Sequence, residues 1–154
     1  YRRVALVRPD VSLVILGDGP ERASLERMVG EQRIPHVFFE GYVQSEDLPQ
    51  YLACADLFVF HTLYDAFGLV LSEAMAAELP AVVTNTGGLA EAAKDGETGF
   101  VVPPKDPTAF AKALILLLEK GELRESFSRE AKSRVQALFS LEQMLSLTEN
   151  IYGS

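Results

Sequence analysis

The sequence has one cysteine, no run of basic residues and no apolar stretch long enough to cross a bilayer. A single cysteine excludes an intrachain disulfide, and the alanines on either side of Cys54 predict a small buried thiol in a reducing compartment. The 14 lysines and arginines do not cluster and the formal net charge is −8, which disfavours a nucleic-acid-binding function. The chain starts without Met or a signal-peptide pattern, so we expect a cytoplasmic protein whose true beginning lies upstream.

The composition is that of a globular protein with one core. The chain has 154 residues, of which 48% are hydrophobic and 23% charged, a balance that is not typical of disordered segments. This length suits one domain and is short for two domains with a cleft between them. We therefore expect a single domain over residues 1–154.

Short apolar runs alternate with helical patterns along most of the chain. The runs are at 11–16, 37–39, 57–60, 81–84 and 100–102, and the helix candidates are at 21–32, 45–55, 68–77 and 89–94. Strand and helix alternation implies right-handed crossovers over a parallel sheet. The predicted fold class is α/β, a doubly wound parallel sheet of buried strands.

The last third of the chain has a helical pattern only. Three apolar faces follow one another, the first ended by Gly121 and the last two separated by a corner at Phe139-Ser140. They consist of Phe110, Ala113, Leu114, Leu117 and Leu118; of Leu123, Phe127, Ala131 and Val135; and of Leu141, Met144, Leu145 and Ile151. We expect three C-terminal helices.

The first motif with possible chemistry is Gly17-Asp18-Gly19-Pro20, which follows a strand and precedes a helix. Glycines there let the backbone turn tightly and approach a ligand at the carboxyl end of the strand. A plain turn with Pro20 at the first helical position explains these residues nearly as well.

The most informative stretch runs from Asp65 to Pro80, and a helix opens within it at Gly68. Helix N-termini attract anions, so the N–H groups of Phe67, Gly68 and Leu69 could meet a diphosphate or a sugar hydroxyl. Glu73 lies about one and a half turns into a largely apolar helix, where a carboxylate must be paired, hydrogen-bonded or facing a ligand such as a ribose diol.

Each acid also has an ordinary interpretation. Glu73 could be a solvent-exposed helix residue, and Asp65 a loop acid or a cap. Their eight-residue offset around Phe67-Gly68, ending in Glu73-Ala74-Met75-Ala76, makes the functional interpretation stronger because several independent features coincide.

This stretch resembles the signature of the retaining GT-B glycosyltransferases of family four, in which two glutamates flank a Phe-Gly pair. The resemblance extends over nearly the whole chain and is to the C-terminal, nucleotide-sugar-binding domain. Its other segments are 13–21 (LVILGDGPE), 39–43 (FEGYV), 55–59 (ADLFV), 86–88 (TGG) and 95–104 (DGETGFVVPP).

The resemblance assigns a role to each matching residue. Glu73 matches the acid that holds the ribose hydroxyls, and Asp65 matches the acid that contacts the donor sugar. Neither is assigned as a nucleophile; both would position the donor. The remaining matches are the donor-binding positions Gly17, Gly41, Tyr42, Val43, Phe67, Gly68, Leu69, Gly87 and Gly88.

Three residues depart from the family pattern. Asp65 replaces Glu and is one methylene shorter, so its contact with the sugar is altered or weaker. Glu78 stands where Gly is common at the helix end, a position that often needs left-handed geometry and costs other residues about 1 kcal/mol. His61 replaces a common Pro, with a structural role favoured over a ligand contact.

The resemblance also implies what lies outside this sequence. Family members have the strand order 3-2-1-4-5-6, and the present sequence starts after the central first strand and after the Arg and Lys that neutralise the donor diphosphate. Residues 1–7 resemble the tail of the helix that follows them. We therefore expect a fragment of a two-domain enzyme whose acceptor, a glycan or lipid, binds the missing N-terminal domain.

The implied reaction is transfer of a sugar, with retention, from a UDP-, GDP- or ADP-linked donor to an acceptor hydroxyl. No cofactor is expected. The sequence has no Asp-x-Asp pair and no cluster of His and Cys residues at the spacing of metal ligands. A non-catalytic nucleotide-binding module is the first alternative, and a structural α/β interaction domain without a ligand is the least favoured one. We expect the isolated chain to be inactive, to bind nucleotides weakly and to self-associate, whereas the full-length enzyme could work at the inner face of the membrane.

Overall fold

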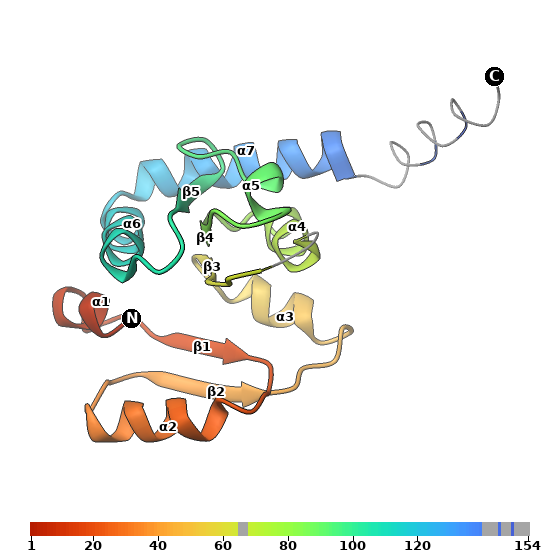
Figure 1. Cartoon of the computed structure of the whole chain (residues 1–154). Helices are drawn as coiled ribbons and strands as arrows, with labels where there is room; N and C mark the ends of the chain where they lie inside the picture. Colours follow the sequence, from red (N-terminus) through yellow and green to blue (C-terminus); the bar gives the residue numbers. More distant parts are fainter. Residues whose placement is uncertain (65–67, 140–144, 146–148, 150–154) are drawn as a thin grey trace. The chain divides into compact units, whose positions relative to one another are not determined.

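The computed structural model describes residues 1–64, 68–139, 145 and 149, and the chain divides into two compact units, Tyr1–Tyr51 and Leu52–Ser154 (Figure 1). Helix α3, Leu48–Ala53, contains the boundary between them. Among the described helices, none combines the length and the apolar character needed to span a membrane.

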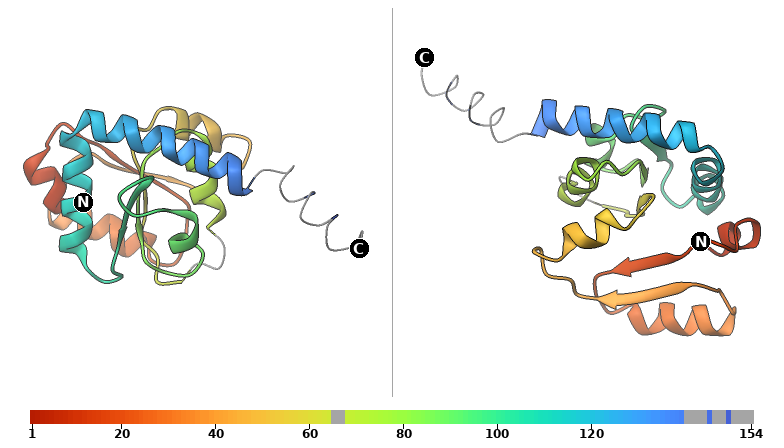
Figure 2. Two further views of the ribbon diagram at one scale, coloured as in Figure 1. Left: turned by 90° about the horizontal axis from the view of Figure 1, so that it is seen from above. Right: turned by 180° about the vertical axis from the view of Figure 1, so that it is seen from behind.

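Unit 1, Tyr1–Tyr51, is built on two parallel strands. In chain order its other elements are α1 (Arg2–Val7), β1 (Leu13–Leu16), α2 (Arg22–Glu31) and β2 (Val37–Gly41). The register pairs Val14 with Phe38, and α2 runs alongside the two strands (Figure 2). The predicted helical character of residues 1–7 is confirmed by α1.

Unit 2, Leu52–Ser154, contains a three-stranded parallel sheet of order β3-β4-β5. Its elements are β3 (Phe58–Phe60), α4 (Leu69–Ala76), β4 (Ala81–Thr84), α5 (Leu89–Ala92), β5 (Gly99–Val102), α6 (Pro107–Glu119) and α7 (Gly121–Phe139). Helix α6 begins at Pro107, with the side chain of Asp106 accepting from the N–H groups of Thr108 and Ala109.

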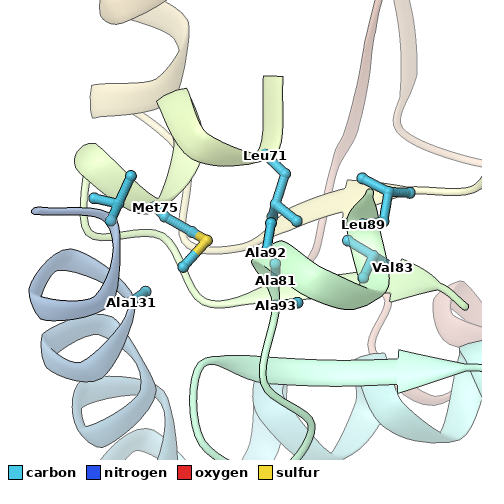
Figure 3. Packing of buried hydrophobic residues seen from close by; sticks show 9 residues of the cluster. Leu71, Met75, Ala81, Val83, Leu89, Ala92, Ala93 and Ala131 are labelled. Atoms are coloured by element: carbon cyan, nitrogen blue, oxygen red, sulfur yellow. The ribbon is translucent and has the colours of Figure 1, made fainter. Parts of the chain in front are cut away.

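The core of unit 2 lies where α4, α5 and α7 meet the sheet. Leu71 and Met75 of α4, Val83 of β4, Leu89 of α5 and Ala131 of α7 belong to one cluster, in which Met75 lies on the side of Ala131 (Figure 3). All five are fully buried. Apolar residues three and four apart on α4 and α7 thus supply one continuous core.

The predicted α/β class with parallel strands is confirmed. Within each sheet the strand order agrees with the order expected from the resemblance, because β1 and β2 correspond to its strands 2 and 3, and β3 to β5 to its strands 4 to 6. The expectation of a single domain over residues 1–154 stays a prediction.

The prediction of five buried strands was correct only for β4, in which every residue is buried. Strand β4 has a hydrogen-bonded neighbour on both sides. By contrast, β1 and β2 form a two-stranded sheet in which Val14 is 47% and Phe38 49% exposed. With one pairing edge each, these strands alternate between covered and exposed residues.

Three local predictions also need correction. Cys54 is exposed rather than buried, because α3 ends at Ala53 and residues 53–56 all lie at the surface. Pro20 is not the first helical residue, since α2 begins at Arg22 after a turn in which Arg22 N–H donates to the Gly19 carbonyl. Gly121 does not end α6, because α6 ends at Glu119 and Gly121 is the first residue of α7.

The left-handed geometry predicted for Glu78 is confirmed. Glu78 has a φ of 62° and follows α4, where Leu79 N–H donates to the Ala74 carbonyl and Glu78 N–H to that of Met75. These two bonds form a Schellman motif. The side chain of Glu78 pairs with Lys132 of α7 at 2.6 Å.

Candidate functional site

The first predicted site residues form the N-terminus of α4. Gly68 is the N-cap residue, with a left-handed φ of 74°, and its carbonyl accepts from Leu71 and Ser72. Glycine has no side chain with which to cap the first N–H groups of the helix, and Leu69 beside it is 65% exposed. The positive end of the α4 dipole therefore lies at the buried Gly68, next to the exposed Leu69.

A second helix N-terminus meets the first. Gly88 is the N-cap residue of α5, and Gly87 before it has a φ of 47°. A Cβ atom added to Gly68 would lie 3.1 Å from the Leu89 side chain and 3.8 Å from the Gly88 carbonyl carbon. The structure thus brings the predicted residues Gly68 and Gly88 together, so that the positive ends of two helix dipoles lie close to each other.

The opposite end of α5 is capped from α7. Arg134 donates from Nε to the Ala92 carbonyl and from Nη2 to the Glu91 carbonyl, both at 2.7 Å. A helix of four residues has few hydrogen bonds of its own, so this bidentate contact helps to fix its direction.

Glu73 lies farther along α4, on the exposed side of the helix. Leu71, Ala74 and Met75 around it are buried, but Glu73 itself is exposed. Within the described part of the chain its carboxylate has no hydrogen-bond or ion-pair partner. Water can reach the Glu73 carboxylate, so its apolar neighbours do not force it to have a partner, and the prediction that they would was wrong. Its contact with a ribose stays a prediction.

Asp65 and Phe67 lie outside the described residues. The chain just before them is described, and there His61 contacts the ring of Phe110 edge-on, with 5.6 Å between ring centroids. This contact agrees with the structural role favoured for His61.

The remaining predicted residues belong to unit 1 and form a second group. Gly17 has a φ of 116° and donates its N–H to the Gly41 carbonyl at 2.6 Å, and Gly41 has a φ of 75°. Tyr42, next along the chain, is 73% exposed, and Val43 is half-buried. Both strand ends thus adopt conformations that favour glycine, and they leave the Tyr42 ring available for stacking.

Arg22 also belongs to this group and was not predicted from the sequence. A Cβ atom on Gly41 would lie 2.8 Å from Nη1 of Arg22, so the guanidinium occupies the space that a side chain at position 41 would need. Arg22 also pairs with Asp18 at 3.3 Å and with Glu26 at 2.8 Å, and it donates to the Phe39 carbonyl. The four-residue spacing on both sides of Arg22 was the signal that could have identified it.

No three His, Cys, Asp or Glu side chains of the described ranges gather where they could hold a metal ion. The groups suited to a ligand are the helix N-termini at Gly68 and Gly88 in unit 2 and the glycine-lined strand ends in unit 1. Such backbone donors bind phosphates and hydroxyl groups.

The chain is similar to known proteins over nearly its whole length. An N-acetyl-alpha-D-glucosaminyl L-malate synthase of Bacillus anthracis is 34% identical over 144 residues, which are 93% of this chain and 37% of that protein. A sucrose-phosphate synthase of Thermosynechococcus elongatus superposes with a TM-score of 0.82 at 31% identity, over 97% of this chain and 41% of the other. HepE of Anabaena, solved with UDP-glucose, superposes with a TM-score of 0.86 at 23% identity, over 99% of this chain and 44% of the other.

The chain therefore spans well under half of the length of the relatives that it matches. The family model for glycosyl transferases group 1 matches residues 2–134, most of the sequence. On this match, the chain belongs to the group 1 glycosyl transferases.

Proposed function

We propose that this chain binds the nucleoside diphosphate sugar donor of a retaining, metal-independent hexosyltransferase, which works in the cytoplasm on an acceptor glycan or lipid. The observation that carries the proposal is the convergence of the α4 and α5 N-termini at Gly68 and Gly88. The family match and the UDP-glucose complex of HepE, which has the same fold, support it.

In this proposal the donor diphosphate lies against the two helix ends, whose dipoles stabilise the charge of the leaving group. Glu73 accepts hydrogen bonds from the ribose hydroxyls, and Asp65 orients the sugar. Gly17 and the segment from Gly41 to Val43, in unit 1, stay predicted donor-binding residues. The acceptor binds residues outside this chain, in keeping with the share of each relative that the chain covers.

The decisive experiment is a calorimetric or NMR titration with UDP, GDP and ADP, followed by their glucose conjugates. Each exposed helix end contributes only about 0.3 to 1 kcal/mol, so we expect weak binding by the isolated chain. Glu73→Gln should weaken nucleotide binding by about 1 to 3 kcal/mol, because a charged hydrogen bond is lost.

Glu130→Gln is the matched control, since Glu130 is an exposed glutamate on α7, outside the predicted site. It should leave the affinity unchanged. A folded Glu73→Gln variant with the affinity of the parent chain would refute the ribose assignment.

A non-catalytic nucleotide-binding module is the second candidate, and the shorter acid at position 65 favours it. If Asp65 orients a sugar, Asp65→Glu should change the affinity for the nucleotide sugar more than that for the bare nucleotide. Equal changes would remove this role from Asp65. Sugar transfer by this chain, or by any protein that contains it, would exclude the non-catalytic alternative.

A further inference from the structure

Thr84, the last residue of β4, is a fully buried polar residue outside the predicted donor-binding positions. Its Oγ1 donates to the Thr62 carbonyl at 2.7 Å and accepts from the Thr62 N–H at 3.1 Å. One hydroxyl therefore satisfies both backbone groups of a single residue on the neighbouring segment, using its proton and one lone pair.

The position of this contact in the sheet explains its effect. The register between β3 and β4 ends with Phe60 opposite Val83. Thr62 is two residues beyond that last pair, where the strands have ceased to exchange backbone hydrogen bonds. The side chain of Thr84 thus extends the ladder and holds the chain that leaves β3 against the end of β4.

A second hydroxyl continues the same pattern toward the proposed site. Thr62 Oγ1 donates to the Tyr64 carbonyl at 2.8 Å and accepts from the Tyr64 N–H at 3.2 Å. Tyr64 is the last described residue before Asp65. The position of Tyr64 therefore depends on Thr62, and that of Thr62 on Thr84.

Thr84 also contacts the turn before α5. Its Oγ1 lies 3.5 Å from Oγ1 of Thr86, whose carbonyl accepts from Leu89 N–H at the start of the helix. The turn of Gly87 and Gly88 follows directly. One buried hydroxyl thus contacts both segments that lead to the proposed sugar and diphosphate contacts.

We propose that Thr84 is a positioning residue for the donor, whose hydroxyl fixes the segment leading to Asp65 relative to the turn at Gly87 and Gly88. The proposal rests on the proposed function, because it assigns these segments to a nucleoside diphosphate sugar. Groups that recognise a ligand bind best when buried contacts behind them set their geometry in advance.

The test uses two substitutions of Thr84 and a matched control. Thr84→Val keeps the shape but leaves the N–H and carbonyl of Thr62 without a partner, whereas Thr84→Ser keeps the hydroxyl. Thr98→Val is the control, because Thr98 is also buried and its hydroxyl bonds the N–H and carbonyl of Lys94 in the same way. Both valine variants should therefore lose comparable stability.

Amide hydrogen exchange without ligand gives the first result. Thr84→Val should accelerate exchange at Thr62 and Tyr64 by about tenfold or more, while Thr84→Ser and Thr98→Val should not. Unchanged exchange at both positions in Thr84→Val would overturn the proposal, whatever the chain binds.

Titration of the folded variants gives the second result, with whichever of UDP-, GDP- and ADP-glucose the unmodified chain binds and with its bare nucleotide. Thr84→Val should weaken binding of the nucleotide sugar by about tenfold and that of the nucleotide less, and Thr84→Ser should restore it. If Thr84→Val and Thr98→Val lost equal affinity for the nucleotide sugar, Thr84 would act only on stability, and the proposal would fail. An unmodified chain that binds none of the three would refute the proposed function, and the exchange rates would still show whether Thr84 holds the segment.

Discussion

Unit 1 and unit 2 contain the same kinds of elements but bury them to different extents. In unit 1, all of which the structure describes, the buried hydrophobic residues are Val4 and Ala5, and α2 has none. In unit 2 a continuous cluster joins α4, α5, α7 and the sheet. In these two sheets the strand that is buried throughout is β4, which has a neighbour on both edges.

The largest expected contrast between the units comes from removing one leucine side chain. Leu71→Ala in unit 2 should lower the free energy of unfolding by about 2 to 5 kcal/mol, because Leu71 is fully buried in the core. Leu25→Ala in α2 of unit 1, where the leucine is 42% exposed, should cost less than about 1 kcal/mol. Urea denaturation followed by circular dichroism measures both, and equal costs would contradict the contrast.

Replacing a glycine by alanine should lower the stability of unit 2 and raise that of unit 1. A Cβ atom at Gly99 of β5 would lie 2.0 Å from the Ala81 carbonyl oxygen, so Gly99→Ala should destabilise unit 2 by about 1 to 3 kcal/mol or more. At Gly30 in α2 a Cβ atom would meet nothing within 4 Å. Gly30→Ala should therefore stabilise α2 by about 0.5 to 1 kcal/mol. Thermal unfolding gives both signs, and a stabilised Gly99→Ala variant would exclude the close approach of β4 and β5.

A smaller change in stability is expected at the C-terminal ends of α2 and α4, which have the same capping motif. Like Glu78 after α4, Arg33 after α2 has a left-handed φ, 49°, and the bonds from Ile34 to Val29 and from Arg33 to Gly30 repeat the Schellman pattern. Arg33→Gly should stabilise the protein by about 1 kcal/mol. Glu78→Gly should gain less, since it also removes the exposed ion pair with Lys132.

A double-mutant cycle between Glu78 and Lys132 separates the two contributions to the Glu78→Gly effect. In a background carrying Lys132→Met, Glu78→Gly should stabilise as much as Arg33→Gly does. A smaller gain in that background would mean that the backbone conformation of Glu78 carries little cost.

The smallest expected effect concerns the pKa of one carboxyl group in unit 1. The Arg8 guanidinium donates two hydrogen bonds to Asp10 and lowers the pKa of its carboxyl group from 3.8 to about 2. The pair therefore stabilises the fold fully above pH 3.8 and loses this contribution as the pH falls toward 2. In an NMR titration Arg8→Gln should return the pKa of Asp10 toward 3.8, whereas Arg27→Gln on α2 should not change it.

What the sequence could predict follows from how local each feature is. Apolar runs and glycines identified the strands and the starts of α4 and α5, because both depend on a few consecutive residues. The left-handed conformation of Glu78 was predictable for the same reason, since it depends on the end of one helix.

The errors concern features set by distant parts of the chain. Whether β1 is buried depends on how many strands pair with it, and the exposure of Glu73 depends on which face of α4 meets the core. The bond from Thr84 to Thr62 joins residues 22 positions apart, and that from Arg134 to Ala92 joins residues 42 apart. No periodicity or motif encodes such pairs.

The order of strands in unit 2 also bears on how the chain folds. Strands β3, β4 and β5 are neighbours in the sheet in the order in which they occur in the sequence, with Phe58 opposite Ala81 and Ala81 opposite Gly99. Each pairing closes one short crossover, so the loop-closure entropy is low for a parallel sheet, and low contact order favours rapid folding. During synthesis on the ribosome, this sheet can form without waiting for distant segments, and it would complete its core when α7 emerges.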